Sequence, residues 1–362
     1  MKVGILGAGQ LARMIALAGY PLGLEFIFLD PSADACANKL GEHLQGDYND
    51  LDLLAQLAER ADVVTYEFEN VPANVAEFLA SHTQVHPSPK ALAVAQDRLV
   101  EKTFFNDIDI ATPAYAAVNS LEELKTAMAD IGYPAVLKSR TQGYDGKGQS
   151  VLNSPDDITA AWQLLDGVPA IVEAFVNFQR EVSIIAARNQ AGEIAYYPLS
   201  ENLHRGGILR VSECTNGDPM QGQAQSYVTR LLEALNYVGV LALELFEVNG
   251  KLIANEFAPR VHNSGHWTIE GAETSQFENH LRAILDLPLG SCHAVNKAAM
   301  VNFIGGLPTT KEILAIPGAH LHLYGKEPRK GRKVAHATIH TSSAISELKQ
   351  MLVNLADQVD DS

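Results

Sequence analysis

Short apolar segments alternate with amphipathic segments over the first ninety or so residues of the chain. The apolar segments have the length of buried strands, and helix-like patterns at residues 10–18 and 51–59 separate them. The apolar segments are residues 3–6, 25–29 and 62–65. Strands that alternate with helices in this way form a parallel sheet. We therefore predict a Rossmann-like N-terminal domain of residues 1–96.

The pattern changes in the rest of the chain. A helix is predicted from about Asp97, and helical periodicity returns at residues 221–235 and 276–285. Strands are predicted at residues 134–138, 170–173, 181–188, 194–198, 320–324 and 333–340. Because the strands at 170–173, 181–188 and 194–198 follow one another closely, we predict that they form one antiparallel sheet. The fold class is then mixed α/β and α+β, with a second domain of residues 97–292 and a small β-rich domain of residues 293–362, which ends in a frayed acidic tail at 357–362.

Composition limits the kind of protein. A chain of 362 residues is too long for one ordinary core, and 47% hydrophobic with 19% charged residues is typical of a globular protein. No apolar run is long enough to cross a membrane, and the first strand begins almost at Met1, without a signal peptide. Three widely spaced cysteines fit reduced thiols, and a net charge of −16 argues against a general nucleic-acid binder. We expect a cytoplasmic protein.

The most informative segment is a strand-like run that contains a charge. Glu244 interrupts the apolar run 241–246, the turn dipeptide Asn249-Gly250 follows, and Glu256 stands near the end of the returning strand. Mg²⁺ often uses one or two carboxylates together with substrate phosphates. A solvated hairpin is the alternative, but a buried charge needs a partner. We therefore interpret the two glutamates as metal ligands, with Arg260 and His262 able to hold a small anion beside the metal.

This interpretation imposes a condition on the hairpin. Side chains alternate between the two faces of a strand, and a two-residue turn at Asn249-Gly250 would place Glu244 opposite Asn255. Glu256 would then point to the other face. The metal hypothesis therefore requires a loop with an odd number of residues, or a β-bulge.

A glycine-rich turn follows the first strand. The sequence from Gly7 to Ala12 matches the dinucleotide fingerprint, and Asp30 stands where a ribose-binding acid belongs. The same turn serves any phosphate or polar ligand that binds backbone amides at a helix N-terminus. Gln10 and Arg13 are able to contact a substrate there.

Two further segments carry candidate phosphate ligands. Lys138 ends a strand, and the loop 143–149 that follows has three glycines and Lys147, although it lacks the Walker A ending. A flexible surface hairpin is the alternative for this loop. The only dense basic run is residues 326–333, where Pro328 and Gly331 favour a structured loop that binds phosphate over a solvated face. His320 and His322, which share one strand face, are interpreted as structural.

Several longer stretches together carry a resemblance. They read GAGQLARM from Gly7, YEFENV from Tyr66, LKSRTQGYDGKGQ from Leu137, NEFAPRVHNSGHW from Asn255 and KEPRKGRKVAH from Lys326. They resemble the ATP-grasp superfamily and, within it, the family of 5-(carboxyamino)imidazole ribonucleotide synthases. Ala8 and Ala12 stand where relatives often have glycine.

The resemblance implies an ADP-forming ligase of purine biosynthesis. Such an enzyme uses ATP and Mg²⁺ to carboxylate 5-aminoimidazole ribonucleotide with bicarbonate, through carboxyphosphate, and is commonly a homodimer. It implies no nucleic-acid or membrane partner. Because carboxyphosphate hydrolyses readily, the loop 143–149 is expected to close as a lid that excludes water.

The resemblance also implies site residues. Glu244 and Glu256 would bind the metal. The ATP site would comprise Arg98, Lys138, Gly143, Tyr144, Asp145, Gly146, Lys147, Gly148, Gln149, Glu173, Ala174, Phe175, Val176, Glu181, His204, Asn255 and Glu256. Bicarbonate and the acceptor would contact Gln10, Glu69, Tyr144, Asp145, Arg260, His262, Asn263, Ser264, Lys326 and Arg332. Catalysis would involve Arg260, His262, Asn263 and Asp145, the last as a possible proton acceptor.

Three other functions remain open from the residues alone. An NAD-dependent oxidoreductase would explain the first glycine-rich turn but leaves the carboxylate hairpin and the basic run without a role. A non-catalytic nucleotide-binding module would bind ATP without turnover. Another ATP-grasp ligase or carboxylase would use a different acceptor.

Overall fold

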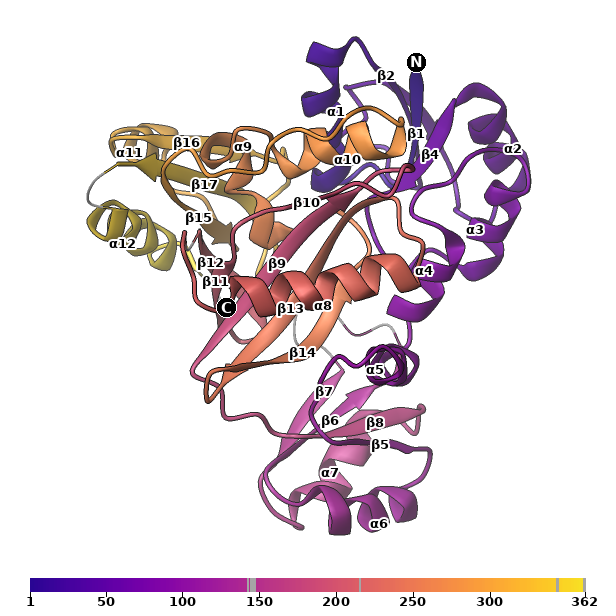
Figure 1. Ribbon diagram of the computed structural model, residues 1–362, viewed down its shortest axis with the longest axis vertical. Coiled ribbons are helices and arrows are strands. Elements are labelled where there is room, and N and C mark those ends of the chain that lie inside the picture. The colour runs from indigo at the N-terminus through magenta and orange to yellow at the C-terminus, as the bar shows by residue number, and fades with distance from the viewer. Residues whose placement is uncertain (142, 144–147, 215, 343–344, 361–362) are drawn as a thin grey trace.

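Three β-sheets organise the part of the chain that the computed structural model describes, which is residues 1–141, 143, 148–214, 216–342 and 345–360 (Figure 1). The N-terminal sheet is parallel throughout, in the order β3-β2-β1-β4. Its strands are β1 (Lys2–Leu6), β2 (Glu25–Asp30), β3 (Glu42–Gln45) and β4 (Val63–Tyr66). The helices of this region are α1 (Gln10–Gly19), α2 (Leu51–Arg60), α3 (Ala73–Ala80) and α4 (Pro89–Ala95), with a short 3₁₀ turn, η1 (Tyr20–Leu22). The predicted parallel sheet is confirmed.

A small antiparallel sheet forms a separate lobe at the bottom of Figure 1. Its order is β5-β8-β6-β7, with strands β5 (Tyr115–Val118), β6 (Ala135–Ser139), β7 (Gln149–Leu152) and β8 (Ala170–Ala174). Helices α6 (Leu121–Ile131) and α7 (Asp157–Leu164) pack Leu124, Met128 and Ile158 against its apolar residues. The prediction that residues 170–173 share a sheet with 181–188 was wrong. The chain changes sheets between β8 and the next strand, because β8 pairs with β5 and β6, which precede it.

The central sheet has nine strands, all antiparallel, with β14-β13-β9-β11-β12-β15-β17-β16 as its main path and β10 paired to β9. The strands are β9 (Arg180–Arg188), β10 (Ile194–Tyr196), β11 (Ser200–Arg205), β12 (Ile208–Cys214), β13 (Gly239–Val248), β14 (Lys251–Ala258), β15 (Lys297–Ile304), β16 (Ala319–Leu323) and β17 (Lys333–Thr341). Strands after residue 293 extend this sheet, since β12 pairs with β15. A domain boundary at residue 293 therefore stays a proposal.

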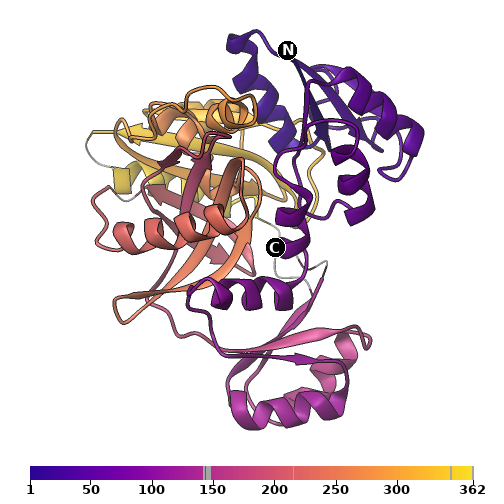
Figure 2. The same ribbon diagram turned by 45° about the vertical axis from the view of Figure 1, so that its right-hand side comes forward.

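Helices cover both faces of the central sheet (Figure 2). Alternate residues of β9 and β13 point to opposite faces, as in any strand. One set packs on α8 (Gln221–Ala234) and the other on α10 (Gln276–Ile284). The remaining elements are α5 (Arg98–Asp107), η2 (Asn263–Gly265), α9 (Thr268–Gly271), α11 (Thr310–Leu314) and α12 (Ile345–Asp357). No helix in the described ranges is long and apolar enough to span a membrane.

The acidic C-terminal segment is not frayed where the structure describes it. Asp357 ends α12 and accepts a hydrogen bond of 2.9 Å from Arg205, and Asp360 forms an ion pair of 2.8 Å with Arg210. The frayed-tail prediction was therefore wrong for residues 357–360, because arginines of β11 and β12 lie beside these carboxylates.

Candidate active site

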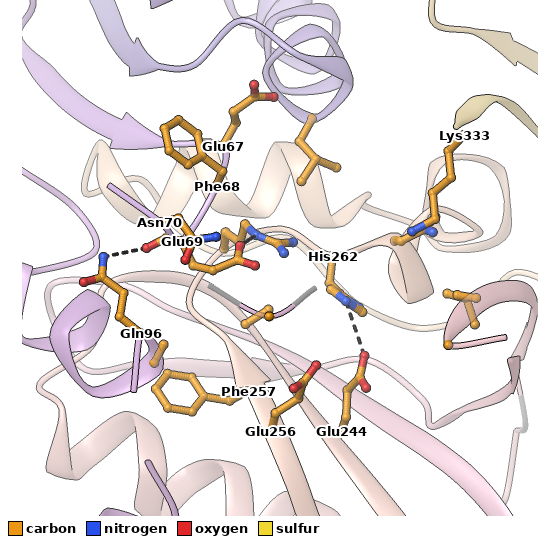
Figure 3. A pocket seen from close by; sticks show the side chains of 18 of the residues that line it. Glu67, Phe68, Glu69, Asn70, Gln96, Glu244, Glu256, Phe257, His262 and Lys333 are labelled. Atoms are coloured by element: carbon orange, nitrogen blue, oxygen red, sulfur yellow. Dashed lines mark hydrogen bonds and ion pairs between the residues drawn. The ribbon is translucent and has the colours of Figure 1, made fainter. Parts of the chain in front are cut away.

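A cavity of about 400 Å³ lies where the N-terminal region, the central sheet and the C-terminal strands meet. The segment after β4 lines one side with Glu67 and Glu69, and the β13–β14 hairpin lines another with Glu244 and Glu256. Figure 3 shows these two pairs of glutamates across the cavity from each other, with His262 beside Glu244. Lys333 reaches the cavity from the start of β17. The cavity is therefore rich in ionisable groups of both signs.

A β-bulge brings the two hairpin carboxylates to one face. The turn is a two-residue one, with Asn249 and Gly250 at φ values of 51° and 72°, so Val248 pairs with Lys251. The register then shifts: Leu245 pairs with Ala254, but Glu244 pairs with Glu256, which leaves Asn255 as the extra residue. The condition that the metal hypothesis imposed on the hairpin is thus met by a bulge.

The two carboxylates create an excess of negative charge that suits a cation. Burial and then the neighbouring Glu256 raise the pKa of Glu244 to about 7. Oxygen donors of this kind fit Mg²⁺, which completes its coordination with water and substrate phosphates. Among the described residues no group of three or more His, Cys, Asp or Glu side chains surrounds a single position. The pair therefore fits a metal that is shared with a bound nucleotide, rather than an all-protein metal cage.

His262 lies against this pair as a neutral ring. Its Nε2 is 3.3 Å from Oε1 of Glu244, and its Nδ1 is 2.9 Å from Oγ of Ser264. Burial and then the positive charge of Arg260 lower the pKa of His262 well below its usual value. Ser264 is fully buried and is not among the residues that line the cavity. Its hydroxyl accepts a hydrogen bond of 2.8 Å from Ser183 and contacts the His262 ring, which it helps to orient.

Arg260 and Asn263 complete this wall of the cavity. The Arg260 guanidinium forms an ion pair with Glu69. Burial raises the pKa of Glu69, but Arg260 outweighs it and holds that pKa below its usual value. Both polar atoms of the Asn263 side chain are buried, with no hydrogen-bond partner among the described residues. An amide with a free donor and a free acceptor, next to an arginine, suits a small oxyanion.

Most of the described residues assigned to ATP lie on or beside strands of the small and central sheets, and Arg98 begins helix α5. Lys138 is 3.1 Å from Glu173, which is also 3.2 Å from Lys102, so one buried carboxylate joins two lysines. Burial lowers the pKa of Lys138. His204 pairs with Glu181, and Arg98 donates to the backbone oxygens of Ser139 at 3.0 Å and Gly143 at 3.3 Å. Ala174, Phe175 and Val176 come directly after Glu173 in the chain, and the Phe175 side chain is exposed.

The residues assigned to the acceptor are only partly brought together. Lys326 donates a hydrogen bond to Gln10, so the basic loop reaches the N-terminal helix. Arg332 donates to the backbone oxygen of Glu327 at 3.2 Å and does not line the cavity, whereas Lys333 does. Gln149 begins β7, and Gly148 directly precedes it. The assignments to Tyr144, Asp145, Gly146 and Lys147 lie outside the described residues.

The glycine-rich turn after β1 is occupied by the protein itself. The Glu67 carboxylate accepts hydrogen bonds from the backbone amides of Gly9 and Ala12, the latter at 3.1 Å. A Cβ placed on Gly7 or Gly9 would lie 2.4 or 2.5 Å from Glu67 atoms. Asp30 accepts from the amides of Ala8 and Ser32, so it braces the turn. An intramolecular carboxylate thus takes the place where a dinucleotide pyrophosphate would bind.

Sequence reasoning missed several residues that shape the cavity or its walls. They are Glu67, Gln96, Glu101, Lys102, Tyr324 and Lys333. One signal was available, because Glu101 stands one helical turn before the buried Phe105 and therefore falls on the inner face of α5. Lys333 stands at the end of the basic run that was assigned to phosphate.

Comparison with known proteins decides the family. The ribonucleotide synthetase preATP-grasp domain model matches residues 1–96, the ATP-grasp domain model residues 103–277, and the phosphoribosylaminoimidazole carboxylase C-terminal domain model residues 298–350. The N5-carboxyaminoimidazole ribonucleotide synthase of Pseudomonas aeruginosa is 55% identical over 94% of both chains. The chain belongs to the N5-carboxyaminoimidazole ribonucleotide synthases. Members of this family are ADP-forming ATP-grasp ligases, so an NAD-dependent oxidoreductase is excluded.

Solved structures of N5-carboxyaminoimidazole ribonucleotide synthases share the whole fold. The structure from Thermus thermophilus is 50% identical, with a TM-score of 0.93 over 99% of both chains. The structure from Aspergillus clavatus, solved with ADP and 5-aminoimidazole ribonucleotide, is 31% identical, with a TM-score of 0.91 over 99% of both chains. The predicted ATP-grasp fold is confirmed.

Proposed function

We propose that this protein joins a carboxyl group from bicarbonate to the amine of 5-aminoimidazole ribonucleotide, with ATP as the energy source, in purine biosynthesis. The products are N5-carboxyaminoimidazole ribonucleotide, ADP and phosphate. The observation that carries the proposal is the full-length likeness to a relative solved with ADP and 5-aminoimidazole ribonucleotide. A cavity lined by a carboxylate pair, an arginine and an amide that has no hydrogen-bond partner within the described ranges supports it.

The nucleotide is proposed to bind between the small lobe and the central sheet. Lys138 and Arg98 would face its phosphates, since both are cations at the edge of the glycine-rich loop. Glu173 and the backbone of residues 174–176 would hold the adenine, with Glu181 on the ribose hydroxyls and His204 beside it. The ion pair between Glu181 and His204 supports this placement of the two residues on one side of the nucleotide.

Mg²⁺ is proposed to bind at Glu244 and Glu256. When bound, it would supply positive charge to the phosphate oxygens. The role of the chain is to keep both carboxylates on one face, where the positive charge of the metal would favour their ionised form. His262, which stays neutral beside them, would orient Glu244 without adding a competing positive charge.

Bicarbonate is proposed to bind at Arg260, His262 and Asn263. A bicarbonate oxygen attacks the γ-phosphorus of ATP, the bond to ADP breaks, and carboxyphosphate forms. The ribonucleotide amine then attacks the carboxyl carbon, the carbon–oxygen bond to phosphate breaks, and the nitrogen loses a proton. Arg260 would stabilise the negative charge of the transferring group, and Glu69 would hold its guanidinium in place. Asp145 is proposed as the proton acceptor.

The ribonucleotide phosphate is proposed to lie at Lys326 and Arg332, with Gln10 nearby. The hydrogen bond from Lys326 to Gln10 supports a site shared by the basic loop and helix α1. We further propose that the protein acts in the cytoplasm as a homodimer.

A substrate-omission assay tests the proposal. Purified protein is supplied with Mg-ATP, bicarbonate and 5-aminoimidazole ribonucleotide, and phosphate release and the carboxylated product are both measured. Full activity should require all of these components, and the product should carry label from ¹³C-bicarbonate. Faster turnover with another amine acceptor would favour a different ATP-grasp carboxylase. ATP binding without turnover would favour a binding module.

A further inference from the structure

The strand that carries Glu256 is an edge strand. Among the described strands, β14 has only β13 as a neighbour in the central sheet. Half of its backbone N–H and C=O groups therefore face away from the sheet, and buried backbone groups require hydrogen-bond partners. Helix α5 packs against this free edge. The partners of the outward groups show how the bulge at Asn255 is held.

Before the bulge, neutral groups serve the outward backbone groups of β14, apart from the Ala254 carbonyl, which accepts from Lys102 at 3.4 Å. The amide of Leu252 donates to Gln223 at 3.1 Å, and its carbonyl accepts from the Tyr227 hydroxyl at 3.3 Å. The amide of Ala254 donates to the backbone oxygen of Ala111 at 2.7 Å. These contacts recur at every second residue, as expected for a regular strand.

At the bulge, two buried side chains of helix α5 take over from these partners. Lys102 donates to the carbonyl of Asn255 at 2.7 Å, and Glu101 accepts from the amide of Phe257 at 2.8 Å. Lys102 and Glu101 are only 1% and 2% exposed. Lys102 also pairs with Glu173, so its charge is balanced. Two adjacent helix residues thus contact the backbone on both sides of Glu256.

This pattern of contacts is specific for the bulged register. Without the bulge, the outward groups would belong to residues 252, 254 and 256, and the amide of Phe257 would face β13. The Glu101 acceptor would then lose its donor. A one-residue change of register also turns every following side chain to the other face, so Glu256 would leave the face of Glu244.

We propose that Glu101 and Lys102 are positioning residues for the carboxylate pair, because they hold the Asn255 bulge and so keep Glu256 beside Glu244. The inference rests on the proposed role of that pair in binding Mg²⁺ with the nucleotide. Glu101 and Lys102 act through the backbone of β14.

The test compares variants of Glu101 that differ in one property. Glu101→Gln keeps an oxygen that can accept from Phe257, whereas Glu101→Met keeps the size but removes the acceptor. Tyr227→Phe is the matched control, because it removes a hydrogen bond to the same strand on the other side of the bulge. ADP affinity is measured by calorimetry with and without Mg²⁺, and amide exchange is measured at Phe257.

Glu101→Met should lose about tenfold of the affinity that Mg²⁺ adds for ADP, and its Phe257 amide should exchange faster. Glu101→Gln should restore most of that gain, and Tyr227→Phe should keep it. Should Glu101→Met fail to fold, Lys102→Met, which removes the cation from the Asn255 carbonyl, should give the same loss. If Mg²⁺ increased the ADP affinity of a folded Glu101→Met or Lys102→Met protein as much as that of the wild type, the inference would be overturned.

Glu256→Gln in the same experiment separates the two claims. If Mg²⁺ no longer increases the ADP affinity of Glu256→Gln but still increases that of Glu101→Met, the proposed metal site is supported and the positioning role is wrong. If Glu256→Gln itself keeps the gain, the proposed metal site is wrong and the positioning role falls with it.

Discussion

The carboxylate of Glu67 accepts a hydrogen bond from the backbone amide of Gly9, at the point where helix α1 begins. A helix N-terminus attracts anions, because its first amides have no partner within the helix. The Glu67 carboxylate supplies that anion from within the chain. The turn that most resembles a dinucleotide site is therefore closed to a pyrophosphate.

The first prediction concerns ligand selectivity. Mg-ADP should raise the melting temperature of the protein, because it binds only the folded state, whereas NAD at the same concentration should leave it unchanged. Differential scanning fluorimetry with each ligand, and with Mg²⁺ alone as a control, measures this. Stabilisation by NAD comparable with that by Mg-ADP would contradict the position assigned to Glu67.

Sequence patterns predicted the elements and the chemistry of the hairpin better than the way in which segments meet. The alternation of strands and helices gave the parallel sheet, and Glu244 within an apolar run gave the carboxylate pair. The bulge at Asn255 was recognised only as a requirement, because it depends on contacts with Glu101 and Lys102 from a helix about 150 residues earlier. The change of sheet after β8 and the pairing of Asp360 with Arg210 depend equally on distant segments.

The second prediction concerns Glu256. Glu256→Gln should lower turnover about a hundredfold or more, because the carboxylate is proposed to hold Mg²⁺, whose positive charge would act on the transferring phosphoryl group. Its Mg-free ADP affinity should change little, since the proposed adenosine contacts lie on other residues. Steady-state phosphate release and calorimetry measure the two quantities, with the melting temperature as a check on folding. Near-normal turnover in a folded variant would remove Glu256 from the metal site.

The third prediction concerns the basic loop. Arg332→Ala should raise the KM for 5-aminoimidazole ribonucleotide by about 10-fold to 100-fold, because it removes a contact to a charged phosphate. The KM for ATP should stay nearly the same. Lys330→Ala is the matched control, since Lys330 is an exposed cation two residues away. A loss confined to ATP affinity would assign the loop to the nucleotide.

The fourth prediction concerns pH and the junction between the N-terminal and central sheets. The amide of Val240 donates to Nδ1 of the buried His280, so Nε2 carries the proton and donates to Thr65 at 2.8 Å. Burial lowers the pKa of His280 to about 3. The folded-state pKa lies below the unfolded value of about 6.5. The stability that the neutral His280 ring contributes is therefore present above pH 6.5 and is lost as pH falls towards 3.

Between pH 7 and pH 5 the wild type should therefore lose roughly 2 kcal/mol more unfolding free energy than His280→Gln, which has no proton to gain there. Urea unfolding at both pH values measures the difference. His293→Gln serves as the control, since that side chain is 89% exposed. Equal pH dependence in wild type and His280→Gln would show that His280 titrates normally.

The central claim is that ATP activates bicarbonate, and the fate of the bicarbonate oxygens tests it most directly. The protein is given ¹⁸O-bicarbonate, ATP, Mg²⁺ and 5-aminoimidazole ribonucleotide, and the released phosphate is analysed by mass spectrometry at early times. If a bicarbonate oxygen attacks the γ-phosphorus and the carbon–oxygen bond later breaks, the phosphate should carry one ¹⁸O atom. Phosphate that carries only oxygens from ATP and water would contradict the account.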